Sequence, residues 1–292
     1  MKIYMAPMEG VTNYVFRKVY IKHFSGVDKF FTPFITPHMK KGFSKSELME
    51  LNSEYNKGQY LIPQILTNSA EDFLKLADEI EEMGYSEFNI NLGCPSGTVT
   101  SKGRGSGFLQ DPEALDRFFY EIFEKKDNIT ISVKTRIGFS DYGEWDDLLK
   151  VYKKYDFNEI IIHPRLRSDF YKNNIHLPSF TEACNTFKQN IIYNGDIKTL
   201  DDVNDLKTKI FDEKVTGIMI GRGLVRNPLL AESIKENIET ISIIRTIEFL
   251  DDIVEEYMSL GFGERNTLFK LKEIWGMIIG DDDRYVKILK KI

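Results

Sequence analysis

The chain has 292 residues, of which 42% are hydrophobic and 29% charged, and its formal net charge at pH 7 is −6. The length and composition suit one large folded domain, or one with a small appendage, and argue against disorder. The negative net charge argues mildly against a nucleic-acid-binding protein, but it leaves room for a local basic patch. No apolar run approaches the ~20 residues of a membrane span, and the start of the chain is interrupted too early for a signal peptide.

Short apolar runs rich in β-forming residues recur along the chain, each followed by a helix-like segment. We predict strands at residues 3–8, 30–36, 60–66, 88–93, 130–136, 159–165, 190–196 and 217–223. Several are continuously hydrophobic, as at 160–162, which is typical of strands buried on both faces of a parallel sheet. We predict helices at residues 70–83, 112–125, 145–155 and 200–210. Asp111 and Pro112 supply a cap and a first turn for the second of these.

Eight alternations of strand and helix favour a TIM (β/α)8 barrel, an α/β fold, and the alternative is an open doubly wound sheet. The barrel is preferred because polar residues follow nearly all eight strands, where a barrel has its active-site mouth. Beyond Asn227 and Pro228 the strand signal ends, and helices are predicted at 243–260, 264–279 and 282–291. We therefore expect a barrel domain over 1–238 and a small all-helical C-terminal domain over 239–292. The latter either caps the barrel or docks a substrate.

The residues at the predicted strand ends suit a flat, phosphorylated redox cofactor. Gln64 and Lys134 could bond the polar edge of a flavin ring, and Lys134 would be costly to bury without an anion. The glycine turns after the last two strands lie where barrels commonly bind phosphate. Taken singly these signals are weak, because residues 194–196 also fit a plain turn and His163 also fits a structural histidine.

The run Asn91-Leu92-Gly93-Cys94-Pro95 is the most informative segment of the chain. A cysteine held at a strand end can supply a proton, and the glycines that follow allow movement or close approach of a ligand. The second cysteine, Cys184, fits a helix-packing residue. Two cysteines so far apart suggest a reduced, cytoplasmic compartment, and neither they nor the four scattered histidines indicate a metal site.

Several ordered motifs together resemble the bacterial type of tRNA-dihydrouridine synthase, a family of flavoenzymes. The motifs occupy residues 6–12, 91–96, 109–112, 133–138, 163–171, 194–197 and 219–223. The resemblance implies FMN as cofactor, NADPH as reductant, tRNA as partner, and a monomer. It assigns FMN contacts to Pro7, Met8, Glu9, Gln64, Lys134, His163, Asn194, Gly195, Asp196, Gly221 and Arg222.

The resemblance further implies that FMNH⁻ gives a hydride to C6 of a flipped-out uracil and that Cys94 gives a proton to C5. Asn91 and Tyr171 would hold the uracil, with Arg165 and Arg167 near the RNA. Pro164, Arg104 and the short C-terminal region depart from the family pattern. Two other functions remain open: an FMN-dependent reductase of a free small molecule, such as a pyrimidine or an enone, and a non-catalytic RNA-binding role.

Overall fold

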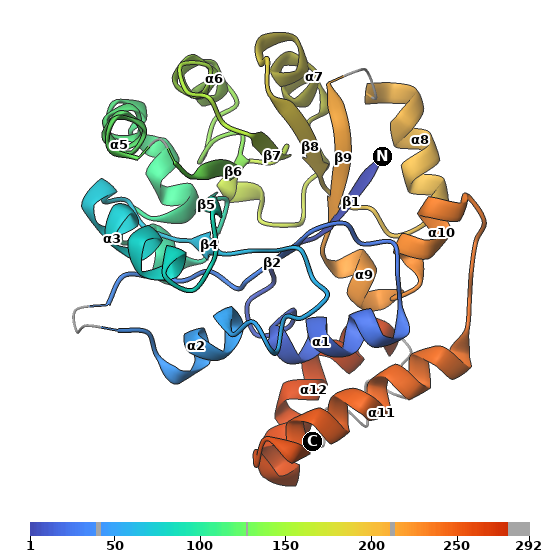
Figure 1. Cartoon of the computed structure of the whole chain (residues 1–292). Coiled ribbons are helices and arrows are strands. Elements are labelled where there is room, and N and C mark those ends of the chain that lie inside the picture. The colour runs from blue at the N-terminus through green and yellow to red at the C-terminus, as the bar shows by residue number, and fades with distance from the viewer. Residues whose placement is uncertain (39–41, 127, 211–213, 280–292) are drawn as a thin grey trace.

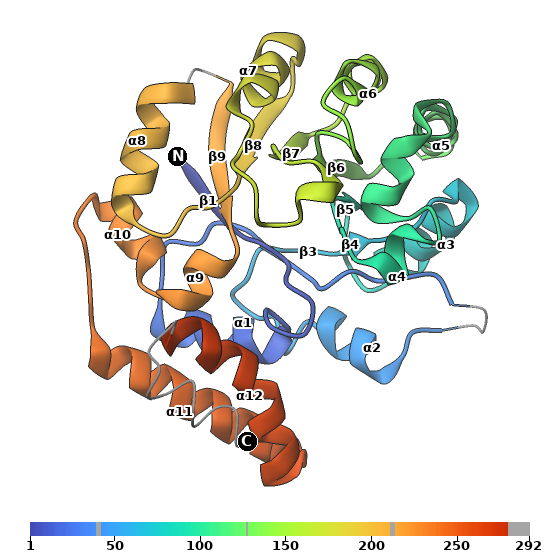
Figure 2. The ribbon, with the colours of Figure 1, turned by 180° about the vertical axis from the view of Figure 1, so that it is seen from behind.

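Parallel strands curl into a closed barrel in the computed structural model, which describes residues 1–38, 42–126, 128–210 and 214–279 (Figures 1 and 2). Seven strands form one sheet in the order β1-β9-β8-β7-β6-β5-β4, and β2 pairs with β3. The strands are β1 (Lys2–Met5), β2 (Phe30–Phe31), β3 (Leu61–Ile62), β4 (Gln64–Ile65), β5 (Glu87–Leu92), β6 (Thr130–Arg136), β7 (Glu159–His163), β8 (Asn190–Asn194) and β9 (Val215–Ile220).

The barrel closes through two isolated bridges. Tyr4 bridges to Lys29 beside β2, and Ile35 bridges to Ile65 of β4. β3 and β4 are two parts of one strand divided at Pro63, whose ring nitrogen carries no hydrogen to donate. The nine short strands therefore occupy eight positions, and the predicted (β/α)8 barrel is confirmed.

Helices surround the barrel, and those predicted from the sequence are present. They are α1 (Tyr14–His23), α2 (Lys45–Leu51), α3 (Ala70–Glu81), α4 (Gly97–Thr100), α5 (Pro112–Lys125), α6 (Glu144–Tyr152), α7 (Leu177–Thr186), α8 (Leu200–Ile210), α9 (Arg222–Arg226), α10 (Leu230–Glu236), α11 (Ile243–Ser259) and α12 (Gly263–Ile279), with 3-10 turns at η1 (Gly105–Gln110) and η2 (Arg167–Asp169). The predicted helix at 282–291 lies outside the described residues. The Asp111 side chain caps α5 by accepting from the Ala114 backbone N–H at 2.9 Å.

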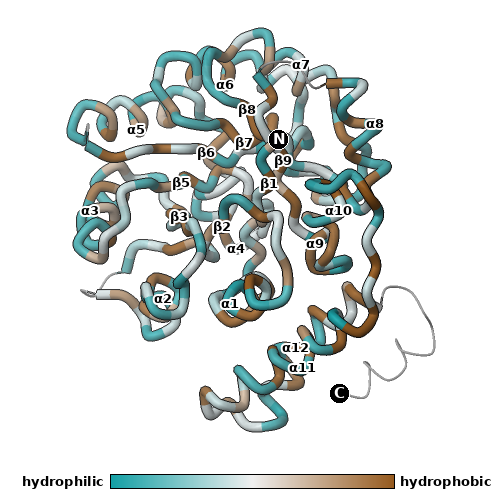
Figure 3. The backbone as a smooth tube through the Cα atoms, turned by 45° about the vertical axis from the view of Figure 1, so that its right-hand side comes forward, coloured by the Kyte–Doolittle hydropathy of each residue, from teal (hydrophilic) through white to brown (hydrophobic). Residues whose placement is uncertain are grey.

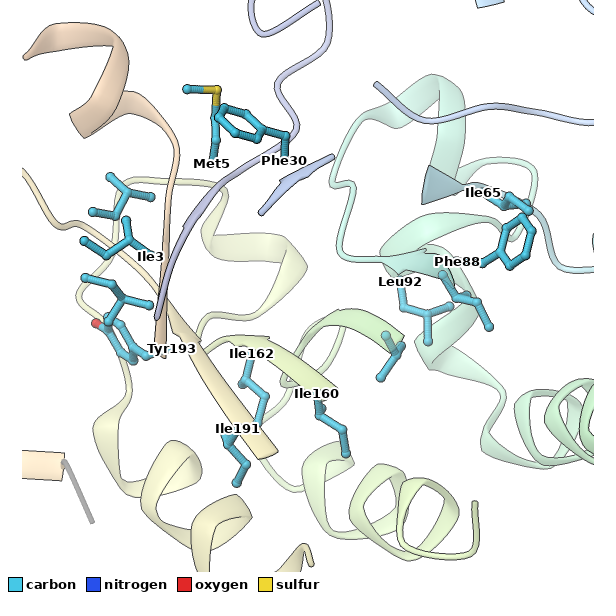
Figure 4. Close-up of a cluster of buried hydrophobic side chains, with 14 of the residues drawn as sticks. Ile3, Met5, Phe30, Ile65, Phe88, Leu92, Ile160, Ile162, Ile191 and Tyr193 are labelled. Atoms are coloured by element: carbon cyan, nitrogen blue, oxygen red, sulfur yellow. The ribbon is translucent and has the colours of Figure 1, made fainter. Parts of the chain in front are cut away.

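The strands bury side chains on both faces, because alternate residues point in opposite directions. One large cluster lies between the strands and the outer helices, where Ile160, Ile162 and Ile191 pack (Figure 4). Hydrophobic and hydrophilic residues alternate along those helices (Figure 3), as expected for one buried and one exposed face. None of the helices in the described ranges combines the length and the apolar character that spanning a bilayer requires.

The C-terminal helices pack on the barrel rather than standing apart from it (Figures 1 and 2). On α11, the Phe249 ring lies edge-on to three rings of α1 and its C-cap, with centroids 5.1–6.3 Å apart: Phe16, Tyr20 and Phe24. The Asn13 amide also donates to the Tyr257 hydroxyl at 2.7 Å. α12 lies against both α11 and α9, so the end of the described chain reaches the barrel mouth.

Candidate active site

A cavity of about 380 Å³ opens at the C-terminal ends of the strands. This volume lies in the usual range for small-molecule and cofactor sites. The structure brings all the predicted cofactor residues to its lining, together with Asn91, Cys94 and Tyr171: Pro7, Met8, Glu9, Gln64, Lys134, His163, Asn194, Gly195, Asp196, Gly221 and Arg222. Residues from every part of the barrel therefore converge on one site.

Arg165 and Arg167, which the sequence placed near RNA, lie outside the cavity lining. Arg165 is 3% exposed. Its guanidinium pairs with both carboxylate oxygens of Asp196, donates to the Asn173 carbonyl at 2.7 Å, and lies 3.2 Å from Nε2 of His163. It is thus turned into the protein. Arg167 is half-buried and reaches the hydroxyl of Thr100 at 3.4 Å.

The Cys94 loop is held by hydrogen bonds at both sides. The Asn91 side-chain oxygen accepts from the backbone N–H groups of Gly93 and Cys94, each at 3.0 Å. The Cys94 carbonyl accepts from the backbone N–H and the hydroxyl of Ser106, at 3.1 and 2.7 Å. Gly105, at φ +57°, leaves no room for a side chain, because a Cβ there would lie 2.9 Å from that carbonyl.

Cys94 is half-buried and lines the cavity. Burial raises its pKa, and this outweighs the lowering by the Ser96 backbone and by the charges of Lys134 and Arg136. The thiol therefore remains protonated at neutral pH. Its chemistry is that of a proton donor rather than of a thiolate nucleophile.

A chain of hydrogen bonds runs from Asn91 into the barrel interior. The Asn91 amide donates to the Gln64 oxygen at 2.7 Å, and the Gln64 amide donates to the Asn89 oxygen at 2.7 Å. The Asn89 amide donates to the Ser132 hydroxyl at 2.9 Å, and that hydroxyl donates to the Phe88 carbonyl at 3.2 Å. The orientation of the Gln64 amide toward the cavity is thereby fixed.

Two cations of β6 lie side by side at the cavity wall. Burial, together with the neighbouring Arg136 charge, lowers the pKa of Lys134 to about 8. Within the described residues, the Lys134 ammonium has no hydrogen-bond or ion-pair partner, although it lines the cavity. Arg136 is only 1% exposed and donates to the carbonyls of Gly93, Leu166 and Phe170 at 2.8–3.0 Å. Lys134 thus remains available to an anionic or carbonyl group of a ligand.

Tyr171 covers one side of the cavity and is 51% exposed. Its ring lies over the guanidinium groups of Arg136 and Arg222, at 5.4 and 4.6 Å from the centroid, and beside His163. Burial and the surrounding cations lower the pKa of His163 well below its usual value, so the imidazole is neutral. Because Arg165 donates to Nε2, the single ring proton resides on Nδ1.

Close-packed glycine turns form the far end of the cavity. A Cβ on Gly223 would lie 2.1 Å from the Ile197 carbonyl oxygen, and one on Gly195 would lie 2.7 Å from Cδ1 of Ile175. Asp196, at φ +28°, pairs there with Arg165 and Arg222. These two guanidinium groups lower its pKa despite partial burial. The turn therefore presents a fixed carboxylate together with a cation.

Sequence reasoning missed several residues of the site. Asn89 lies within a predicted strand, but only the observed strand register shows that it meets Gln64. Arg136 was visible at a strand end without an assigned role. Glu273 and Met277 of α12 also line the cavity. No local sequence signal connects α12 to a cavity formed by strands that end more than forty residues before it.

A family model described as dihydrouridine synthase matches residues 4–259 of the chain. A probable tRNA-dihydrouridine synthase of Staphylococcus epidermidis is 32% identical over 243 residues, which cover 78% of this chain and 70% of that protein. A probable tRNA-dihydrouridine synthase 2 of Bacillus subtilis is 28% identical over 261 residues, covering 87% of this chain and 78% of that protein.

Solved structures with similar folds have much lower sequence identity. A morphinone reductase is 12% identical with a TM-score of 0.58, covering 82% of this chain and 87% of that one. A variant of NCR from Zymomonas mobilis is 14% identical with a TM-score of 0.56, covering 84% and 90%. At these identities the likeness concerns the fold alone.

Proposed function

The chain belongs to the dihydrouridine synthase family, and on that premise we propose that it is an FMN-dependent enzyme that reduces the C5=C6 bond of uridines in tRNA. The observation that carries the proposal is the meeting in one cavity of a protonated thiol, Cys94, with a cation, Lys134, that has no ion-pair partner among the described residues. The first suits a proton donor, and the second suits the electron-rich edge of a reduced flavin.

The residues present fit FMN. Lys134 and the remaining N–H of the Gln64 amide offer donors to the polar edge of the ring, and the Gly195 and Gly221 turns with Arg222 offer donors to the phosphate. The fixed Asp196 carboxylate orients Arg222, which it meets at 2.9 Å. When bound and reduced, FMN would supply the hydride for C6 of the base, with NADPH as the source of the electrons.

The chain's own residues then control the proton and the base. Asn91 donates one N–H to a carbonyl oxygen of uracil, since its oxygen is already engaged by the loop. Cys94 donates its proton to C5 as negative charge develops there. Tyr171, lying on two guanidinium groups, provides a ring against which an extruded nucleotide can rest. Glu9, whose pKa burial and Glu50 raise, lies across the same opening.

We propose that tRNA docks on the mouth and on α12, which adjoins it beside α9 (Figure 2). Lys198 and Arg222 line the cavity, and Lys270 of α12 lies close enough to Glu9 to offset part of the rise that burial causes in the pKa of that carboxyl. These three cations offer phosphate contacts beside the carboxylates of Glu9 and Glu273. A local group of cations is compatible with the net charge of −6 for the whole chain. Arg165 contributes indirectly, by holding Asp196 and His163, because its guanidinium is buried.

The experiment is mass analysis of digested tRNA from a strain lacking the gene, compared with its parent. We expect at least one dihydrouridine to be replaced by uridine, and its return when the gene is restored. Purified protein should be yellow, and NADPH should bleach it. Unchanged dihydrouridine at every position, with a protein that oxidises NADPH in the presence of an enone, would contradict tRNA as substrate and favour a small-molecule reductase.

A further inference from the structure

The barrel interior has a polar part as well as an apolar part. The apolar cluster comprises Tyr4, Ala6, Phe31, Ile62, Ile161, Ile192 and Met219. Against it, Gln64, Asn89 and Ser132 form one row across β4, β5 and β6, and each is at most 1% exposed. Apolar residues would fill this space without the cost of desolvating amides. The row therefore points to a role in positioning.

Asn91 donates to Gln64 and so joins this row to the Cys94 loop. The direction of donation along the resulting chain of hydrogen bonds is set at both of its ends. At the mouth, the backbone N–H groups of Gly93 and Cys94 can only donate. At the inner end, the Phe88 carbonyl can only accept. Every group between these ends must therefore donate away from the Cys94 loop.

As a consequence, the Asn91 side chain can only donate a hydrogen bond to a ligand in the cavity. Its oxygen already accepts two N–H groups, and its nitrogen gives one hydrogen to Gln64. One N–H remains for a ligand. Uracil offers a carbonyl oxygen at the position where cytosine offers an amino group, so uracil satisfies this N–H and cytosine opposes it.

We propose that Gln64, Asn89 and Ser132 act as one unit that holds the Asn91 amide as a donor and thereby selects uracil over cytosine. This inference rests on the proposed function. Asn89 and Ser132 are positioning residues in it, because they act through Gln64 and Asn91 and do not reach the cavity lining.

Two matched substitutions separate this unit from simple burial effects. In Asn91→Asp, one carboxylate oxygen still accepts from the loop, but the other faces the Gln64 oxygen, so the chain must reverse. In Asn89→Asp, the carboxylate accepts from Gln64 and from the Ser132 hydroxyl, so the direction at Asn91 is kept. If the cost of burying a charge were the only effect, Asn89→Asp would be the more damaging substitution, because Asn89 is fully buried whereas Asn91 lines the cavity.

The assay uses FMN-loaded protein and two transcripts of the tRNA, with uridine or cytidine at the position mapped in the deletion strain. Rates are expressed per bound flavin. We expect Asn89→Asp to keep the wild-type ratio of uridine to cytidine reduction, and Asn91→Asp to lower that ratio at least 30-fold. The inference would be overturned if Asn91→Asp kept the wild-type ratio of uridine to cytidine reduction, or if both variants lowered that ratio equally. No reduction by the wild type would instead overturn the proposed function.

A second measurement does not depend on turnover. In ¹⁵N-labelled FMN-free protein, nuclear Overhauser contacts of the Gln64 side-chain amide hydrogens report which neighbour that amide faces. They should run to residue 89 in the wild type and in Asn89→Asp, and to residue 91 in Asn91→Asp, because the amide turns round there. Wild-type contacts in Asn91→Asp, or turned contacts in both variants, would show that the row does not act as a directed unit.

Discussion

At the scale of single residues, the protonation state of Cys94 determines what the site can do. Burial raises its thiol pKa above the ~8.5 of a free cysteine, so the proton is retained through neutral pH and lost only as the pH rises past that raised value. We predict that Cys94→Ala lowers dihydrouridine formation at least ~100-fold. The flavin should still be reduced by NADPH. Rapid mixing with unmodified tRNA measures both steps, and full turnover by Cys94→Ala would exclude the thiol as the acid.

The charge of Lys134 lowers the stability of the FMN-free protein, although it favours FMN binding. Its pKa of about 8 in the folded protein lies below that of an unfolded lysine, so its charge destabilises the FMN-free fold below pH 8. This penalty disappears as the pH rises from about 8 toward ~10.4. We predict that Lys134→Met raises the free energy of unfolding of the FMN-free protein by roughly 2 kcal/mol at pH 7, and by less at pH 9.5.

The same substitution should weaken FMN binding at least tenfold, because the ring loses its cationic partner. Urea titrations at the two pH values and flavin-fluorescence titrations measure the two effects. A variant that is less stable than wild type at pH 7 and binds FMN equally well would contradict both parts of the argument.

Residue identities at strand ends could be read from the sequence, but their partners could not. Gln64, Cys94 and Lys134 follow or lie in apolar runs, and their chemistry is unusual enough there to suggest a site. Arg165 carries the same kind of signal, yet it turns inward to Asp196, thirty-one positions away. That pairing depends on how two neighbouring strands end, which no local pattern records.

At the scale of elements, the first turn of α9 leaves no room for a side chain at Gly223. We predict that Gly223→Ala destabilises the protein by at least ~2 kcal/mol and weakens FMN retention, because the added Cβ would meet the backbone carbonyl of Ile197. Gly97→Ala, in α4, is the matched control: its Cβ would meet nothing within 4 Å. The control should change stability by no more than ~0.5 kcal/mol in thermal unfolding. Similar losses in both variants would remove the steric explanation.

Element boundaries were predictable where side chains mark them. Pro112–Lys125 and Leu200–Ile210 coincide with the prediction, since Asp111 and Pro112 define the first and a regular apolar spacing defines the second. The strand predicted at 60–66 is divided, because Pro63 interrupts the ladder. The glycines after Cys94 were expected to allow movement or close approach of a ligand. In the structure, Gly105 and Gly107 also let η1 pack closely against the Cys94 backbone and α4.

At the scale of the whole molecule, an ion cluster ties opposite walls together at the floor of the barrel. Lys29 donates to Glu87 at 2.8 Å and to Glu159 at 3.0 Å, and all three side chains are at most 9% exposed. Tyr4 also donates to Glu159. We predict that Lys29→Met lowers the free energy of unfolding by about 3–5 kcal/mol, because it leaves two buried carboxylates without their cation.

Lys2 provides the control for this prediction. It lies 3.5 Å from the same Glu159, but its side chain is 52% exposed. Lys2→Met should therefore change the free energy of unfolding by less than ~1 kcal/mol. Combining Lys29→Met with Glu87→Gln and Glu159→Gln should restore part of the lost stability in urea titrations. A triple variant no more stable than Lys29→Met would argue against the charge imbalance.

The packing of Phe249 on α1 has a consequence for biosynthesis. The aromatic face of α1 is complete once residue 24 has been made, but its cover on α11 arrives more than two hundred residues later. If translation adds about 5–20 residues per second, this aromatic surface of α1 remains uncovered in the nascent chain for roughly ten to fifty seconds. During that interval the emerging polypeptide is a natural client for holdase chaperones at the ribosome, and ribosome-bound intermediates stalled before residue 243 should be the ones they retain.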